Sequence, residues 1–324
     1  MKYGIIGTGW IAEAFINGVR LLTNSEISAV YSRTEEKGNK FALDNNISTV
    51  YTSLDEFAKG DFNCVYIASP NSLHFEQSLK MLENGKNVIC EKPITVTPKE
   101  LEICCEYASK HGLIYMEAIM YMHTPVRDKL LEAVKRIGKI TSAHFDFSQL
   151  SSKYAAYKAG EKPNIFNPSL ATGCLMDLGV YCVYPAVDLF GVPNKILSSA
   201  DFLSTGADGS GSAIFSYEDK TVTLTYSKTG QDYSGSAIYG DEGTITIESI
   251  SKLVNIYLYN KQGEKNEIFA ELTKDELMGY EAVEFEKFIN NPSDKKYSLC
   301  VKRMKETLSV MEKIRDLSGI KFNI

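Results

Sequence analysis

Two glycines near the start of the chain have a spacing that suits the binding of a phosphate group. The segment reads Gly7-Thr8-Gly9-Trp10-Ile11-Ala12 and matches the pattern G-x-G-x-x-A, between an apolar run and a helical pattern. In that place Gly7 permits a tight turn, Gly9 removes a Cβ that would block a pyrophosphate, and Ala12 lets a helix pack close to a sheet. Free N–H groups at the start of the helix would bind the anion. The pattern predicts a dinucleotide site formed by Gly7, Thr8, Gly9, Trp10 and Ile11; the alternative is a glycine-rich turn without a ligand.

The end of the second predicted strand bears on which dinucleotide binds. Sites for NAD usually carry an acidic residue there, which binds the 2′-hydroxyl of the ribose. Here Ser32 occupies that position and Arg33 follows it. A hydroxyl and a guanidinium would bind the 2′-phosphate of NADP, which a carboxylate would repel. The pair therefore favours NADP over NAD; alternatively, Arg33 is a solvated side chain that pairs with Glu35 or Glu36.

Short apolar runs alternate with helical patterns over the first 120 residues and place these motifs in a fold. Strands are predicted at residues 3–6, 27–31, 50–51, 64–68, 87–90 and 114–117, and helices at 10–22, 35–45, 54–58, 73–84 and 98–111. Such alternation is typical of a parallel, doubly wound sheet. The uninterrupted apolar run at 64–68 fits a strand that is buried on both faces.

Ligands of such sheets bind at the carboxyl ends of the strands, and two further segments lie there. Ser69, Asn71 and His74 follow the fourth predicted strand, and Glu91 and Lys92 follow the fifth, in the tripeptide Glu-Lys-Pro. We expect these five residues to lie near the ribose or the nicotinamide of the cofactor. The alternatives are a core histidine for His74 and a surface lysine for Lys92.

The pattern changes after residue 120. A helix is predicted at 125–135, a long strand at 140–150, a strand-rich region at 195–270, and two closing helices at 280–290 and 298–318. Consecutive strands without helices between them imply a mainly antiparallel sheet with one covered face. We therefore predict an α/β chain of two domains. Residues 1–120 form a Rossmann domain that binds NAD(P), and residues 121–324 form an α+β domain with a large open sheet for substrate binding and dimerisation, whose final helix could pack back on the first domain.

Composition and charge set the broad class of the protein. Hydrophobic residues make up 44% and charged residues 23% of the 324 residues, which excludes a disordered chain, a collagen and a coiled coil. The formal net charge of −6 gives no general attraction to nucleic acid.

We expect no membrane segment, because no apolar run approaches ~18–20 residues, and no signal peptide. Seven cysteines without a C-x-x-C pair favour reduced, buried thiols in the cytoplasm. His144 and Asp146 share a strand face but lack an evident third ligand, so we predict no metal site.

Four segments together resemble the Gfo/Idh/MocA family of NAD(P)-dependent oxidoreductases. They are residues 68–74 (ASPNSLH), 85–93 (GKNVICEKP), 172–181 (TGCLMDLGVY) and 188–191 (DLFG), in that order. The resemblance implies that Lys92 lies near the nicotinamide and the substrate, that Asp177 lines the substrate pocket, and that Tyr181 acts with Lys92 as the acid/base centre. A lysine ammonium beside a phenol would lower the phenol pKa from about 10 toward the range useful for proton transfer.

With tyrosine at position 181, the chain resembles the branch of dihydrodiol dehydrogenases and aldose (xylose) dehydrogenases. The inositol dehydrogenase branch carries histidine at this position. The resemblance thus implies an NADP(H)-dependent oxidoreductase that acts on a secondary alcohol or carbonyl of an aldose, polyol or diol. It also implies a homodimer formed through the C-terminal sheet. Two alternatives stay open on the same scaffold: an NAD-dependent glycoside hydrolase, and a non-catalytic regulator that senses a dinucleotide.

Overall fold

The computed structural model of the chain describes residues 1–323 and divides them between two compact units. Unit 1 contains Met1–His123 and Thr273–Lys305, and unit 2 contains Thr124–Leu272 and residues 306–323. Unit 1 is therefore completed by a segment that follows the whole strand-rich region in the sequence. Helix α11 (Lys295–Ser318) begins in unit 1 and ends in unit 2.

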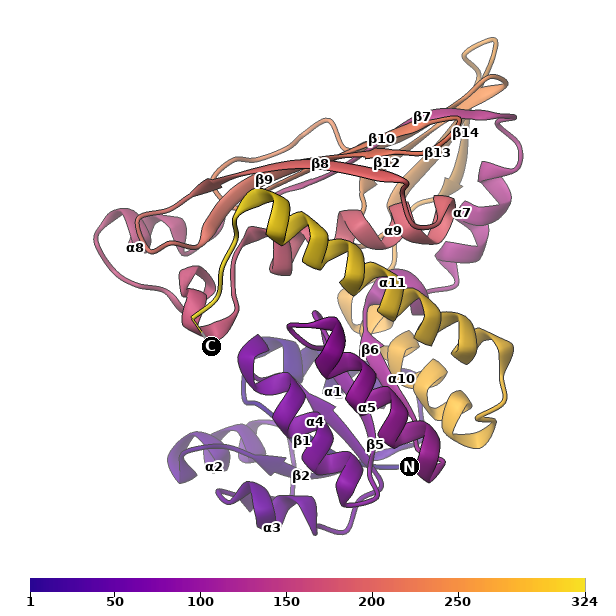
Figure 1. Cartoon of the computed structure of the whole chain (residues 1–324). Coiled ribbons are helices and arrows are strands. Elements are labelled where there is room, and N and C mark those ends of the chain that lie inside the picture. The colour runs from indigo at the N-terminus through magenta and orange to yellow at the C-terminus, as the bar shows by residue number, and fades with distance from the viewer. Residues whose placement is uncertain (324) are drawn as a thin grey trace. The chain divides into compact units, whose positions relative to one another are not determined.

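The core of unit 1 is a parallel sheet of six strands (Figure 1). Its strands are β1 (Lys2–Ile6), β2 (Glu26–Tyr31), β3 (Thr49–Tyr51), β4 (Cys64–Ile67), β5 (Asn87–Glu91) and β6 (Tyr115–Ala118). They lie in the order β3-β2-β1-β4-β5-β6, and every neighbouring pair is parallel. All four residues of β4 are buried, as expected for a central strand. The predicted doubly wound sheet is confirmed, and its strand order reverses between β1 and β4.

The helices of unit 1 connect these strands. They are α1 (Trp10–Leu22), α2 (Glu35–Asp44), α3 (Leu54–Ala58), α4 (His74–Glu83), α5 (Pro98–His111) and the single turn α6 (Met120–His123), with a 3-10 turn at Asn71–Leu73. Helix α5 shows why some bounds follow from the sequence. The Thr97 side chain accepts from the Glu100 N–H, and Gly112 ends the helix with a φ of +66°. Both signals are local, so they act wherever the helix lies.

Helix α10 (Lys274–Asn290) packs on α1 and completes unit 1 (Figure 1). The contact is a close approach of two backbones, because a Cβ on Gly18 would lie 2.4 Å from the Gly279 N atom. Helix α10 begins six residues before the predicted start, since Thr273 and Glu276 form a capping box ahead of the apolar pattern. Its docking brings acidic and basic residues of α10 to the start of α1 and the end of β5.

Unit 2 is built on a sheet of eight strands. They are β7 (Ile140–Ser148), β8 (Lys195–Phe202), β9 (Asp208–Ser216), β10 (Thr221–Ser227), β11 (Ser236–Gly240), β12 (Gly243–Ser249), β13 (Val254–Asn260) and β14 (Lys265–Phe269). Their order is β14-β13-β12-β11-β7-β10-β9-β8. The pair β7 and β10 is parallel, and the other neighbours are antiparallel, which confirms a mainly antiparallel sheet. Burial alternates along β10, so one face of the sheet is covered.

Helices α7 (Val126–Val134) and α9 (Val180–Phe190) lie on the same side of this sheet (Figure 1). The Arg127 guanidinium joins them through two hydrogen bonds to the Asp188 carboxylate, of 2.8 and 2.9 Å, and both side chains are buried. The other short elements of unit 2 are α8 (Tyr154–Lys158), 3-10 turns at Asn164–Phe166 and Pro168–Leu170, and a π-helical turn at Leu175–Gly179. Asp188, which belongs to one of the four family motifs, thus holds two helices together.

The helical run Pro168–Phe190 corrects one sequence-based expectation. By length and composition it is apolar enough to cross a membrane, although no apolar run of that size was expected. In the structure, 83% of its apolar stretch is buried inside the protein. The run is a core segment under the sheet of unit 2. Its residues are apolar because a helix that is buried against a sheet needs apolar side chains.

Candidate active site

The two glycines after β1 differ in why the chain needs them. Gly7 has a φ of +114°, and a Cβ there would lie 2.6 Å from the Ala68 carbonyl oxygen. Gly9 has an ordinary φ of −95°, and no atom of the described chain lies within 4 Å of where its Cβ would stand. The fold therefore requires glycine at position 7 but not at position 9. Because Gly9 has no Cβ, the backbone at this position can be approached from outside, as a pyrophosphate needs.

The start of α1 lies directly behind this opening. Gly9 precedes the helix and provides no side-chain cap for its first N–H groups. The amides of the first turn of this 13-residue helix, together with its dipole, favour an anion at this end. Trp10, the single tryptophan, is 70% exposed, and the Lys274 ammonium of α10 lies 5.5 Å from its ring. Lys274 thus adds a positive charge that sequence patterns near the loop could not indicate.

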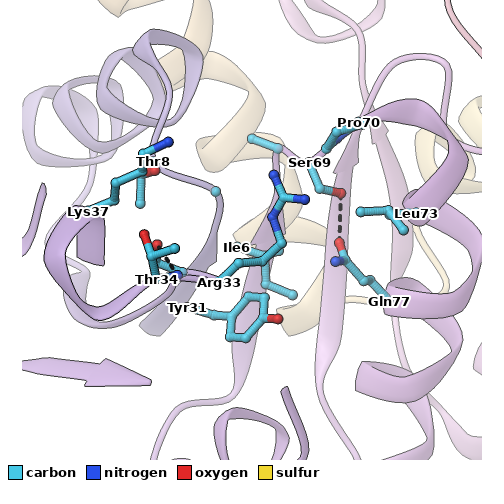
Figure 2. Close-up of a pocket in the computed structure, with 13 residues that line it drawn as sticks. Ile6, Thr8, Tyr31, Arg33, Thr34, Lys37, Ser69, Pro70, Leu73 and Gln77 are labelled. Atoms are coloured by element: carbon cyan, nitrogen blue, oxygen red, sulfur yellow. Dashed lines mark hydrogen bonds between the residues drawn. The ribbon is translucent and has the colours of Figure 1, made fainter. Parts of the chain in front are cut away.

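A cavity of about 380 Å³ lies beside the loop, at the carboxyl ends of β1, β2 and β4 (Figure 2). Its lining consists of Ile6, Gly7, Thr8, Tyr31, Ser32, Arg33, Thr34, Lys37, Ala68, Ser69, Pro70, Leu73 and Gln77. Figure 2 shows the Arg33 side chain extended between Thr8 and Lys37 on one side and Ser69 and Gln77 on the other. Five predicted residues thus meet in one cavity, namely Gly7, Thr8, Ser32, Arg33 and Ser69.

Two cations face this cavity, although the sequence analysis named only one. Lys37 lies in the first turn of α2, four residues after Arg33, which precedes the helix. Within residues 1–323, no ion pair joins Arg33 to Glu35 or Glu36, so the alternative of a surface pair is not what the structure has. Ser32 is 7% exposed and receives the Thr34 N–H at 3.5 Å. Arg33 lies outside α2, before the extended residue Thr34, so helical spacing could not have indicated the second cation.

The loop after β4 is fastened to the loop after β5 by His74. This side chain is 1% exposed, and its Nδ1 and Nε2 atoms lie 2.8 Å from the carbonyl oxygens of Pro93 and Ser69. Burial lowers the pKa of His74, so the neutral ring donates to one carbonyl at a time. Ser69 in turn donates to Gln77 at 2.7 Å. The structure therefore gives His74 the core position that was the alternative for it.

The segment that carries Lys92 is held on both sides. The Lys92 N–H donates to Glu91 Oε2 at 3.2 Å, and Glu91 Oε1 accepts from the Tyr66 hydroxyl at 2.5 Å. Two residues on, the Ile94 N–H donates to Glu117 Oε1 at 2.8 Å. Glu91 and Glu117 are buried, so neither lines the cavity beside Gly7. These bonds fix the backbone at Lys92, and a fixed backbone is what a catalytic side chain needs.

Glu281 of α10 adds a third buried carboxyl group to this region. It is 1% exposed, and its Oε2 atom has no hydrogen-bond partner within the described chain. Burial, with further contributions from Glu91 and Glu117, raises the pKa of Glu281 well above its usual range, against Lys274 and Lys92. Glu281 lies four residues from both Leu277 and Phe285, on the buried stripe of α10, so helical spacing could have indicated its burial. Its carboxyl neighbours Glu91 and Glu117 come from β5 and β6, which no local pattern indicates.

In unit 2, Asp177 lies in the π-helical turn and Tyr181 in the first turn of α9. Turns of this type are rare and recur at functional sites. Gly179 lets the turn approach the sheet, because a Cβ there would lie 3.2 Å from the Tyr226 ring. Tyr181 is 9% exposed and packs edge-on against Phe147 at 5.5 Å. The two predicted residues thus lie on consecutive turns of one helical segment.

Asp177 forms an ion pair with Lys228, which follows β10. Asp177 and Lys228 are 51 residues apart in the sequence, and Lys228 was not among the predicted site residues. The side chain of Lys228 is 3% exposed and that of Asp177 is 31% exposed. No local pattern could have indicated this pair, because it depends on how the π-helical turn lies over the sheet.

Asp208, at the start of β9, anchors the same helical segment. Its Oδ2 atom accepts the Leu175 N–H at 2.6 Å, and a Cβ on Gly173 would lie 1.9 Å from its Oδ1 atom. The side chain is fully buried, and burial raises the pKa of Asp208 to about 6. The carboxyl group thus caps the segment that carries Asp177 and Tyr181, at a cost in charge burial.

The raised pKa of Asp208 predicts how stability depends on pH. The folded chain keeps the Asp208 proton up to pH 6, whereas the unfolded chain releases it near pH 3.8. The stabilisation from this group is therefore complete below pH 4 and is lost as pH rises through 6. Asp208→Asn keeps the acceptor for Leu175 without the charge. Relative to wild type, we expect this variant to gain about 2 kcal/mol of unfolding free energy between pH 4.5 and 7.5, measured by urea denaturation. Parallel pH curves for the two proteins would contradict it.

Three groups of predicted residues occupy different places. Five residues line the cavity; Gly9, Trp10 and Ile11 lie at the open start of α1, and Asn71, His74, Glu91 and Lys92 belong to the fastened loops. On β7, His144 Nε2 lies 3.9 Å from Asp146 Oδ2. Residues 1–323 contain no group of three or more His, Cys, Asp or Glu side chains that could hold a metal ion. None of the seven cysteines, all within residues 1–323, forms a disulfide, and all seven are buried.

A parallel sheet with an open phosphate loop after its first strand and a basic cavity beside it defines a dinucleotide-binding α/β protein. The comparisons with known proteins are more specific. A family model described as "Oxidoreductase family, NAD-binding Rossmann fold" matches residues 1–119, and one described as "GFO/IDH/MocA C-terminal domain" matches residues 129–246. The chain belongs to the Gfo/Idh/MocA family of oxidoreductases, as its four motifs indicated.

One curated relative covers the chain almost completely, and another covers about two thirds of it. A scyllo-inositol 2-dehydrogenase (NADP(+)) of Bacillus subtilis is 35% identical over 99% of this chain and 98% of its own length. A trans-1,2-dihydrobenzene-1,2-diol dehydrogenase of Xenopus tropicalis is 29% identical over 68% of this chain and 66% of its own. A solved 3-ketoreductase of Actinomadura kijaniata, with 18% identity and a TM-score of 0.84, shares the fold over 98% of both chains. The relatives thus include dehydrogenases named for an inositol and for a diol.

Proposed function

We propose that the chain is an NADP(H)-dependent oxidoreductase that transfers a hydride between nicotinamide C4 and a secondary alcohol or carbonyl of an aldose, polyol or diol. Polyols here include cyclic ones, since a relative is named as an inositol dehydrogenase. The observation that carries the proposal is the cavity with Arg33 and Lys37 beside the open side of Gly9. A basic cavity at the end of β2 is what a 2′-phosphate requires and a plain ribose does not.

The residues present fit the cofactor. Gly9 leaves the backbone open where a pyrophosphate would lie against the start of α1. Arg33, Lys37 and Ser32 would hold the 2′-phosphate, and Thr8 and Ser69 line the same cavity. When bound, the nicotinamide accepts or donates the hydride.

The chain's own residues would supply the proton chemistry. Tyr181 takes the proton from the substrate hydroxyl as the alcohol is oxidised, and returns it in the reverse direction. Lys92, on its fixed backbone, lowers the energy of the tyrosinate and of the developing alkoxide. Asp177 accepts hydrogen bonds from substrate hydroxyls.

The choice of cofactor can be tested at Arg33 and Lys37. We expect Arg33→Ala and Lys37→Ala each to weaken NADP binding by ~10–100-fold, because each removes a charged hydrogen bond to phosphate. NAD binding should change by less than about twofold, since its ribose has no phosphate at that position. Titration of Trp10 fluorescence at the start of α1 gives both affinities.

Lys40→Ala is the matched control for this experiment. Lys40 is an exposed lysine of the same helix that does not line the cavity, so its loss changes net charge equally. NADP affinity should stay close to wild type in this variant. Equal losses for NADP and NAD in Arg33→Ala, or a loss in Lys40→Ala as large as in Lys37→Ala, would show that no specific 2′-phosphate site exists here.

Two wider parts of the proposal concern assembly and compartment. Leu197 of β8 and Ile214 of β9 are register partners, and both are about half exposed on the open face of the sheet. An apolar pair in that place suits a second copy of the chain, so we propose a homodimer through this sheet. Sedimentation as a monomer at micromolar concentration would contradict it. Buried cysteines that form no disulfide suit the cytoplasm, where fractionation of cells would place the enzyme.

A further inference from the structure

Lys228 is a buried lysine at the carboxyl end of β10. The residue is 2% exposed. Its N–H donates to the Gly209 carbonyl at 2.8 Å, and its carbonyl accepts the Ser151 N–H at 2.9 Å. The backbone of Lys228 is thus fixed by the segments on either side of it in the sheet. A buried ammonium is unfavourable unless it is paired, so a lysine held this way has a partner that the fold depends on or uses.

That partner is the carboxylate of Asp177. The ammonium reaches it from the sheet side, while almost a third of the Asp177 side chain is exposed. On its other side Lys228 is near the buried carboxyl of Asp208, which caps the same helical segment through Leu175. Lys228 therefore lies between one carboxyl that anchors the segment and one that faces outward. A purely structural pair would not need its acidic member at the surface.

We propose that Lys228 is a positioning residue, which holds the Asp177 carboxylate in one orientation so that it accepts hydrogen bonds from substrate hydroxyls. The inference rests on the proposed function, because that function makes Asp177 a substrate contact. Asp177 lies in the π-helical turn with 31% of its side chain exposed, so its place in the turn leaves its carboxylate freedom to rotate. An ion pair to a rigid, buried lysine removes that freedom before substrate arrives.

A double-mutant cycle tests this role. The variants are Lys228→Met, Lys228→Arg, Asp177→Asn and the double variant Lys228→Met/Asp177→Asn. They are assayed with NADP+ and the best substrate among scyllo-inositol, D-xylose and D-glucose, and substrate binding is followed by calorimetry. Lys228→Met should raise KM ~10–100-fold and lower kcat less, because an oriented charged acceptor is lost. In the Asp177→Asn background the same change should alter kcat/KM by less than ~3-fold. Lys228→Arg should retain more activity than Lys228→Met.

Lys220→Met is the control. Lys220 precedes β10 as Lys228 follows it, and it also pairs with an aspartate, Asp219. Its kinetics should match wild type. Thermal unfolding identifies a variant that does not fold; if Lys228→Met is one, Lys228→Gln takes its place in the cycle.

The outcomes separate this inference from the proposed function. If Asp177→Asn leaves kcat/KM and substrate binding unchanged, the substrate role of Asp177 fails, and the role of Lys228 fails with it. If Asp177→Asn is impaired but the two substitutions add independently, the proposed function stands and the inference about Lys228 is overturned. The inference about Lys228 is also overturned if Lys228→Met leaves KM unchanged and its effect on kcat/KM adds to that of Asp177→Asn.

Discussion

Tyr181→Phe is expected to lower kcat by ~10²–10⁴-fold, because it removes the hydroxyl that exchanges a proton with substrate. The ring should keep its place, since its edge-on contact with Phe147 at 5.5 Å needs no hydroxyl. Affinity for NADP, measured through Trp10 fluorescence, should stay within about twofold of wild type, because the cofactor is held by unit 1 residues. Stopped-flow absorbance of the reduced nicotinamide would measure the hydride step itself.

Lys92→Met should cause a loss of similar size, and the double variant should be little worse than either, because the proposed mechanism makes the two residues one acid/base centre. Tyr217→Phe serves as the control: its hydroxyl donates to the Gly191 carbonyl at 3.0 Å in the same unit, so the variant loses a hydrogen bond outside the proposed site. Wild-type turnover in Tyr181→Phe would remove Tyr181 from the acid/base centre. Cofactor binding without any turnover in the wild-type chain would instead favour the dinucleotide-sensing regulator.

The second large effect concerns the two glycines of the phosphate loop. Substitution of Gly7 should lower the stability of the protein, whereas substitution of Gly9 should lower its affinity for NADP. Gly7→Ala is expected to destabilise the folded chain by about 3 kcal/mol or more, because alanine is strained at a φ of +114° and its Cβ would meet the Ala68 carbonyl. Gly9→Ala should leave the unfolding free energy within about 0.5 kcal/mol of wild type, since no described atom lies near its Cβ. NADP affinity should nevertheless fall ~100-fold or more in Gly9→Ala, because the added methyl group meets the pyrophosphate.

Urea denaturation and fluorescence titration on both variants make this comparison. The informative result is the contrast, with stability lost in one variant and binding lost in the other. Gly9→Ala with wild-type NADP affinity would show that the pyrophosphate does not approach the start of α1. Loss of stability in Gly9→Ala as large as in Gly7→Ala would show that both glycines serve the fold.

Sequence by itself determined the features of this protein that depend on near neighbours in the chain. The strand, loop and helix around Gly7 follow from apolar periodicity and glycine spacing, and helix α5 has its predicted bounds because Thr97 and Gly112 terminate it locally. Ser32 and Arg33 were found because they follow a strand directly. The four motifs were enough to indicate the family, since each is a continuous segment.

Tertiary structure alone decided which distant residues complete those motifs. Helix α10 belongs to unit 1 because Gly18 and Gly279 let two backbones touch, which placed Lys274 near Trp10 and Glu281 among buried carboxyl groups. The Asp177 and Lys228 pair arose because a π-helical turn lies over the end of β10. Contacts of this kind depend on packing between elements that are far apart in sequence, and no periodicity within one element records which element will cover it.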